Sequence, residues 1–128
     1  MRLKELLLVT AVAEVVTGLA LLGLPAIVLL ALLGIQPASV ETLFVSRIAG
    51  AALLAIGVAS FLARSDATLP AQRGLLTSIL LYNVLVALLL VYSGLVLWMT
   101  GLALWPAVVL HTLLGIWCVL TLQAEPRG

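Results

Sequence analysis

Four polar side chains stand inside long apolar stretches of this sequence and are its candidates for chemistry. They are the carboxyl group of Glu14, the guanidinium of Arg47, the amide of Asn83 and the imidazole of His111. Each is costly to place in hydrocarbon unless it is paired, neutral or facing water. Together they supply an acid, a counter-charge, an orienting amide and a proton carrier or hydrogen-bonding base. The pattern therefore predicts an intramembrane polar pocket that binds a ligand or relays protons.

Two tyrosines extend this candidate set. Tyr82 precedes Asn83 in the sequence but is turned about 100° away from it on a helix. Tyr92 lies near the outer end of the same apolar stretch, at the expected level of Arg47 and His111. We assign both tyrosines, with the four side chains above, to ligand binding or proton relay.

Small residues accompany the polar ones at helical spacing. Gly18 follows Glu14 by four positions, and Gly50 follows Arg47 by three. Residues at these spacings share one face of a helix. Because membrane helices associate through small residues, we expect these stripes, and with them the polar side chains, to face one common interior.

The sequence offers little for catalysis or for a metal. One histidine and one deep carboxylate are too few ligands for a stable zinc site. Asp66 lies in a polar segment apart from His111, and Cys118 is the single cysteine. We find no phosphate-binding loop and no nucleophile elbow in the sequence. We therefore predict no catalytic and no metal-ligating residue, name no cofactor, and expect a non-enzymatic protein.

The composition indicates an integral membrane protein. Of the 128 residues, 65% are hydrophobic and 9% are charged, and the mean hydropathy is +1.36. Soluble domains carry about 25% charged residues. A net charge of +1 without a basic run excludes a nucleic-acid partner. We expect one domain over residues 1–128, an all-α polytopic membrane protein with four transmembrane helices in an antiparallel bundle.

Five helices are expected to position the polar residues. The long ones are predicted at Leu6–Leu24, Val40–Ala63, Gly74–Trp98 and from Trp105 to Gln123. Pro25 disfavours continuation of the first, so Pro25–Leu33 is predicted as a short extra apolar helix, at the far interface or folded back. A single kinked and tilted helix is the alternative. Ser39 is the expected N-cap of the next helix, and residues 64–73 are expected to form a loop.

The basic residues predict the orientation in the membrane. All of them except Arg47 fall on one side: Arg2, Lys4, Arg64, Arg73 and Arg127. By the positive-inside rule, both termini are expected in the cytoplasm. Trp98 and Trp105 flank the predicted outer turn, where an aromatic belt is expected.

Short motifs spread over nearly the whole chain resemble one family. The motifs are Glu14…Thr17-Gly18…Pro25-Ala26, Arg47-Ile48-Ala49-Gly50, Tyr82-Asn83 and Trp105-Pro106…His111. This layout is similar to small bacterial four-helix inner-membrane proteins of the DoxX-like type. The resemblance implies a place in the bacterial inner membrane. Through distant relatives attached to quinone-linked redox systems, it also suggests a quinone headgroup or another small amphiphile such as a lipid as the ligand.

Two alternative functions stay open. With few residues outside the membrane, the chain also suits an accessory subunit of a larger membrane complex, or a homo-oligomer. The segment Ala13-Glu14-Val15-Val16 is similar to the first helix of the small multidrug resistance transporters. That second resemblance implies a proton-coupled small-molecule transporter that uses Glu14.

Overall fold

The computed structural model describes residues 2–36, 38–65 and 69–124. Within them the chain forms five helices and no strand: α1 (Arg2–Gly23), α2 (Pro25–Leu33), α3 (Val40–Ala63), α4 (Leu69–Leu95) and α5 (Leu104–Ala124). The four long helices of this described part are apolar and long enough to cross a membrane. The chain is therefore an all-helical, multi-pass membrane protein.

The break between α1 and α2 follows from Pro25. Proline lacks an N–H group and suits the first turn of a helix, so α1 ends at Gly23 and Pro25 opens α2. Gly34 closes α2 with φ +72° and donates its N–H to the Leu30 carbonyl. This left-handed conformation favours glycine. The predicted short extra helix is thus confirmed, and the single kinked helix is excluded.

Glycines allow α1 and α3 to pack with their backbones in contact. A Cβ atom at Gly50 would lie 2.8 Å from the carbonyl oxygen of Gly18, and one at Gly18 would lie 2.7 Å from that of Gly50. A Cβ atom at Gly57 would lie 3.1 Å from the Ala11 carbonyl oxygen. Small residues that let backbones approach are the usual basis of helix pairing in membranes. Helices α1 and α3 therefore form one closely packed pair.

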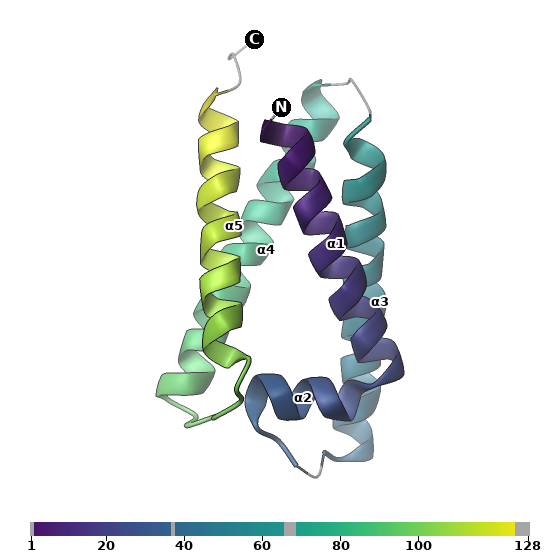
Figure 1. The fold of residues 1–128 in the computed structure, drawn as a ribbon, viewed down its shortest axis with the longest axis vertical. Helices are drawn as coiled ribbons and strands as arrows, with labels where there is room; N and C mark the ends of the chain where they lie inside the picture. Colours follow the sequence, from purple (N-terminus) through teal and green to yellow (C-terminus); the bar gives the residue numbers. More distant parts are fainter. Residues whose placement is uncertain (1, 37, 66–68, 125–128) are drawn as a thin grey trace.

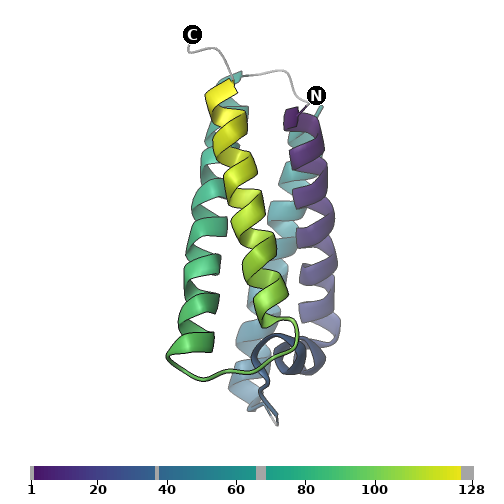
Figure 2. The same cartoon turned by 60° about the vertical axis from the view of Figure 1, so that its left-hand side comes forward.

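The second pair, α4 and α5, packs against the first at the end of the molecule where α1 begins. There a buried cluster joins α1, α4 and α5; its members are Leu6, Leu7, Leu76, Ile79, Leu114 and Cys118. Towards the other end the two pairs diverge, and α2 lies crosswise between them (Figure 1). The turned view shows α2 beneath the ends of α1 and α5 (Figure 2).

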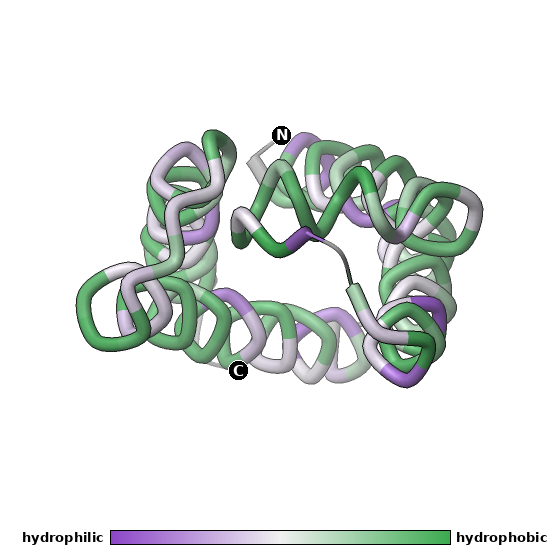
Figure 3. Tube along the Cα trace, turned by 90° about the horizontal axis from the view of Figure 1, so that it is seen from below, coloured by the Kyte–Doolittle hydropathy of each residue, from purple (hydrophilic) through white to green (hydrophobic). Residues whose placement is uncertain are grey.

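Backbone contacts attach α2 to the segment that leads into α5. The N–H of Ala103 donates to the Ala31 carbonyl at 2.7 Å. Gly101 lies so close to Leu32 that a Cβ atom there would overlap the Leu32 carbonyl group. Seen from the α2 end, most of the trace is hydrophobic (Figure 3). The short helix thus lies across this end of the molecule, and all of its residues are apolar.

Several helix boundaries differ from the prediction. Ser39 is the N-cap of α3, and its hydroxyl accepts from the Thr42 N–H at 3.2 Å, as expected. In contrast, α4 begins at Leu69 rather than Gly74, because Pro70 suits a first turn and the polar residues after it continue the helix. It ends at Leu95, and Trp98, with φ +57°, lies beyond it. Residues 66–68 of the predicted loop and Arg127 lie outside the described part of the chain.

Candidate functional site

Tyr82 lies at the centre of a polar cluster formed by α1, α4 and α5. Its hydroxyl donates to Oε2 of Glu14 at 3.4 Å. Its ring meets the His111 ring edge to face, with centroids 5.7 Å apart and an interplanar angle of 78°. Glu14 is 3% exposed. The predicted acid of the first helix and the predicted imidazole of the last therefore lie on either side of one tyrosine.

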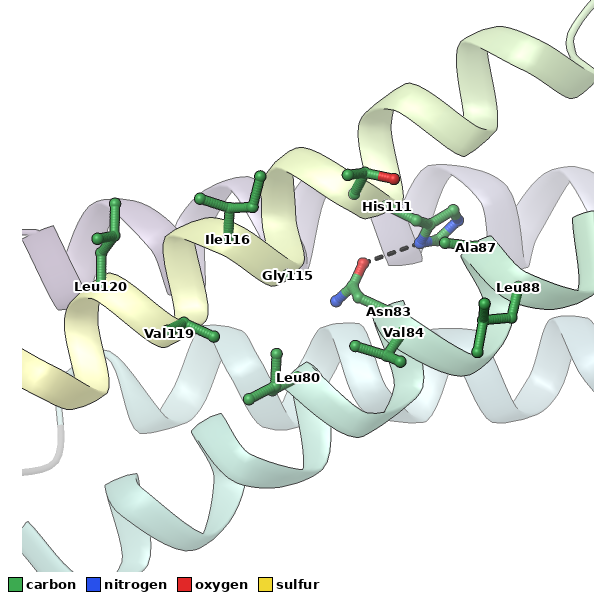
Figure 4. A pocket seen from close by; sticks show the side chains of 11 residues that line it. Leu80, Asn83, Val84, Ala87, Leu88, His111, Gly115, Ile116, Val119 and Leu120 are labelled. Carbon is green, nitrogen blue, oxygen red and sulfur yellow. Dashed lines mark hydrogen bonds between the residues drawn. The ribbon is translucent and has the colours of Figure 1, made fainter. Parts of the chain in front are cut away.

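Asn83 holds the other side of the imidazole. The Nδ1 atom of His111 lies 2.8 Å from Oδ1 of Asn83 (Figure 4). The amide nitrogen of Asn83 donates to the Ile79 carbonyl at 2.8 Å, and the Asn83 side chain is fully buried. Although Tyr82 and Asn83 are adjacent in sequence and point in different directions, both reach His111, one by its ring and one by a hydrogen bond.

Thr10 adds a buried hydroxyl next to this cluster. It lies one helical turn from Glu14, is 0% exposed, and its Oγ1 atom has no hydrogen-bond partner among the described residues. Buried polar atoms usually have partners. Thr10 therefore adds an unpaired buried polar atom one helical turn from Glu14 within the described part of the chain.

A central cavity of about 410 Å³ opens beside Tyr82 and His111. All five helices contribute to its wall, and α2 supplies Ile27, Val28, Ala31 and Leu32. The polar lining side chains are Thr17, Tyr82 and His111, and the others are aliphatic. A largely apolar wall with a few convergent polar groups is typical of a ligand site.

A second hollow lies between α4 and α5 on the outer face. It has a volume of about 380 Å³ and is lined by Asn83, His111 and Thr112 among aliphatic side chains. Figure 4 shows that the hydrogen-bonded pair His111–Asn83 bridges α5 and α4 in this groove. Ile116 and Leu120 line the groove further along α5. His111 thus lines both the central cavity and the outer groove.

The structure does not bring Arg47 or Tyr92 to this cluster. Arg47 is exposed, and its Nε donates to the Leu22 carbonyl at 3.2 Å. This carbonyl is in the last turn of α1, where unpaired carbonyls attract a cation. The physical reason is the glycine stripe: Gly50 faces α1, so Arg47 on that face meets the end of α1 rather than the interior. Tyr92 is 51% exposed and outside both hollows.

Sequence reasoning missed the contribution of α2 to the site. The side chains of Ile27 and Leu32 line the central cavity. Their signal was the apolar run after Pro25, which predicted a helix folded back as one option but no place for it. No group of three His, Cys, Asp or Glu that could hold a metal gathers within the described ranges.

Comparison of the chain with protein-family models, with curated proteins and with solved structures gave no match. The site must therefore be interpreted from its own geometry.

Proposed function

We propose that this chain is a small integral membrane protein whose central cavity binds a small amphiphile, such as a quinone headgroup or a lipid, without carrying out a reaction. One observation carries the proposal: Tyr82 and His111 lie together on the wall of a cavity that is otherwise almost entirely aliphatic. The apolar wall suits a tail, and the two aromatic polar groups suit a ring or headgroup.

The size and polarity of the cavity support this class of ligand. Its volume of about 410 Å³ lies within the range of about 300–1,000 Å³ that holds small molecules. A strongly charged headgroup would be costly to place there, because none of the described lining residues carries a charge that could form an ion pair with it. A neutral ring with an alkyl tail matches both parts of the wall.

The proposal includes a place in the membrane. We place the four long helices as spans of alternating direction in a bacterial inner membrane, the location that the resemblance to the DoxX-like type implies. The basic residues favour both termini in the cytoplasm. The start of α1, which contains Lys4, the start of α4, which contains Arg73, and the end of α5 lie at one end of the molecule (Figure 1). Arg47 is near the other end, which accords with the positive-inside rule.

Equilibrium binding of radiolabelled 4-decylphenol tests the proposal. The purified protein is placed in lipid nanodiscs, and empty nanodiscs give the background. We expect saturable binding of one probe per chain. The variant Ala107→Phe, which fills the cavity from α5, should weaken binding by about tenfold, or about 1.4 kcal/mol.

Ala49→Phe is the matched control, because Ala49 is exposed on α3 and outside the cavity. It adds the same side chain and should leave binding unchanged. Equal loss in both variants, or no saturable binding by the unaltered protein, would refute the proposed function.

A further inference from the structure

We propose that this site recognises its ligand as a hydrogen-bond donor. The acceptor is Nε2 of His111, and an amphiphile with an O–H or N–H group on its head binds in preference to one with only carbonyl or ether oxygens. The inference rests on the proposed function and specifies its ligand class. It follows from the acceptor to which each N–H and O–H group of the polar cluster already donates.

The orientation of the Asn83 amide is determined by its backbone partner. One end of the amide faces the Ile79 carbonyl oxygen at 2.8 Å. A carbonyl oxygen accepts but never donates, so the NH₂ group of Asn83 must be at that end. The Oδ1 atom, an acceptor only, is therefore the atom that faces His111.

The tautomer of His111 follows from this orientation. Its Nδ1 lies 2.8 Å from Oδ1 of Asn83, and two acceptors cannot bond, so Nδ1 must carry a proton. In a neutral imidazole the other ring nitrogen then has a lone pair and no proton. No described residue bonds to Nε2, and His111 lines both hollows. The ring nitrogen of His111 that has no partner among the described residues, Nε2, is therefore a hydrogen-bond acceptor.

The neighbouring tyrosine, Tyr82, likewise offers a ligand lone pairs rather than a proton. The hydroxyl of Tyr82 donates its proton towards Glu14 at 3.4 Å, which leaves oxygen lone pairs for any further partner. Thr17, the remaining polar side chain of the cavity wall, has a hydroxyl that both donates and accepts. At the aromatic end of the cavity, therefore, the protons of Tyr82 and His111 are already donated to other residues of the protein. Only their lone pairs remain for a ligand. Within the quinone class named under the proposed function, the reduced form, a quinol, therefore satisfies the aromatic end of the site. The oxidised quinone presents acceptors to acceptors there.

The tautomer is directly measurable because His111 is the single histidine of the chain. In ¹⁵N NMR of histidine-labelled protein in nanodiscs, we expect a proton on Nδ1 and none on Nε2. Asn83→Leu should shift the tautomer populations, since it removes the acceptor. A proton on Nε2 in the unaltered protein, alone or together with one on Nδ1, would overturn the inference.

Binding of a matched probe pair tests the consequence. The compounds 4-decylphenol and 4-decylanisole share ring and tail and differ in one O–H group. The phenol should bind about 2- to 12-fold more tightly, the value of one net hydrogen bond of about 0.5–1.5 kcal/mol. His111→Phe keeps an aromatic ring against Tyr82 and should abolish this preference.

Thr112→Val is the matched control on the same helix, because the Thr112 hydroxyl already donates to the Val108 carbonyl. It should keep the preference for the phenol. Equal binding of both probes to the unaltered protein would overturn the donor inference and leave the cavity as a ligand site. Saturable binding of neither probe would overturn both.

Discussion

The two helix pairs of this protein differ in how closely their helices approach. In α1–α3 the space for a Cβ atom at Gly18 or Gly50 is taken by backbone of the partner helix, at 2.7–2.8 Å. In α4–α5 an added Cβ atom at Gly94 would meet side chains only, those of Leu104 and Trp105 at 3.1 Å, and one at Gly115 would meet nothing nearer than 3.9 Å. One pair is closed by glycines, and the other leaves a groove.

This difference separates the scaffold from the site. The α1–α3 contact uses backbone atoms, which cannot adjust their positions as side chains can. The α4–α5 pair supplies Tyr82, Asn83 and His111, which are held by side-chain contacts. Glu14 is the exception, because it comes from the scaffold pair and reaches Tyr82. The groups of the proposed binding site are therefore concentrated where the helices pack less tightly.

The largest expected effect is at the closed pair. Gly50→Val places a branched side chain against the Gly18 carbonyl oxygen, and neither backbone can yield without separating α1 from α3. We expect a loss of about 3 kcal/mol in unfolding free energy, at the upper end of overpacking effects. Steric trapping in bicelles measures it. Gly74→Ala, with nothing within 4 Å of its Cβ position, is the control.

A smaller effect is expected where α2 meets the segment before α5. Gly101→Ala forces that segment away from Leu32, and only the short helix must move. We expect a cost of about 1–2 kcal/mol. Hydrogen exchange should rise in α2 and remain unchanged in α1 and α3. Uniform exchange across all helices would show that α2 is not a separately held element.

Asn83→Leu should cost less again. It leaves the Nδ1–H of His111 without its partner, and single side-chain hydrogen bonds between membrane helices contribute about 0.6 kcal/mol and at most about 1.7 kcal/mol. Steric trapping of this variant, beside the Gly50 variant, compares the two pairs on one scale. A loss larger than that of Gly50→Val would reverse our ranking of them.

The smallest effect is expected at the open pair. Gly115→Ala adds a methyl group in ordinary contact distance of Leu80 and Asn83, and alanine favours a helix over glycine by about 0.5–1 kcal/mol. The unfolding free energy should stay the same or rise by that amount. A loss comparable to that of Gly50→Val would mean that both pairs are closed by glycines, and the comparison would fail.

Local chemistry predicted much of this fold. The proline at position 25 marked the break after α1, and Ser39 marked the start of α3. Tyr82 and Asn83, which contact His111, were also predicted as site residues from sequence, because polar groups deep in apolar helices usually pair with one another. Arg47 was misplaced, since a stripe of small residues does not specify which neighbour it faces. The inward position of α2 depends on its contacts with the α5 segment, which no local pattern contains.

Photo-crosslinking with a 4-decylphenol that carries a diazirine on its tail tests the central claim most directly, namely that the space between the two pairs holds an amphiphile. We expect adducts on the cavity residues Val28, Leu32 and Leu90, lost in Ala107→Phe and kept in Ala49→Phe. Adducts confined to outward-facing residues such as Leu102, which is 94% exposed, with equal yield in both variants, would contradict it.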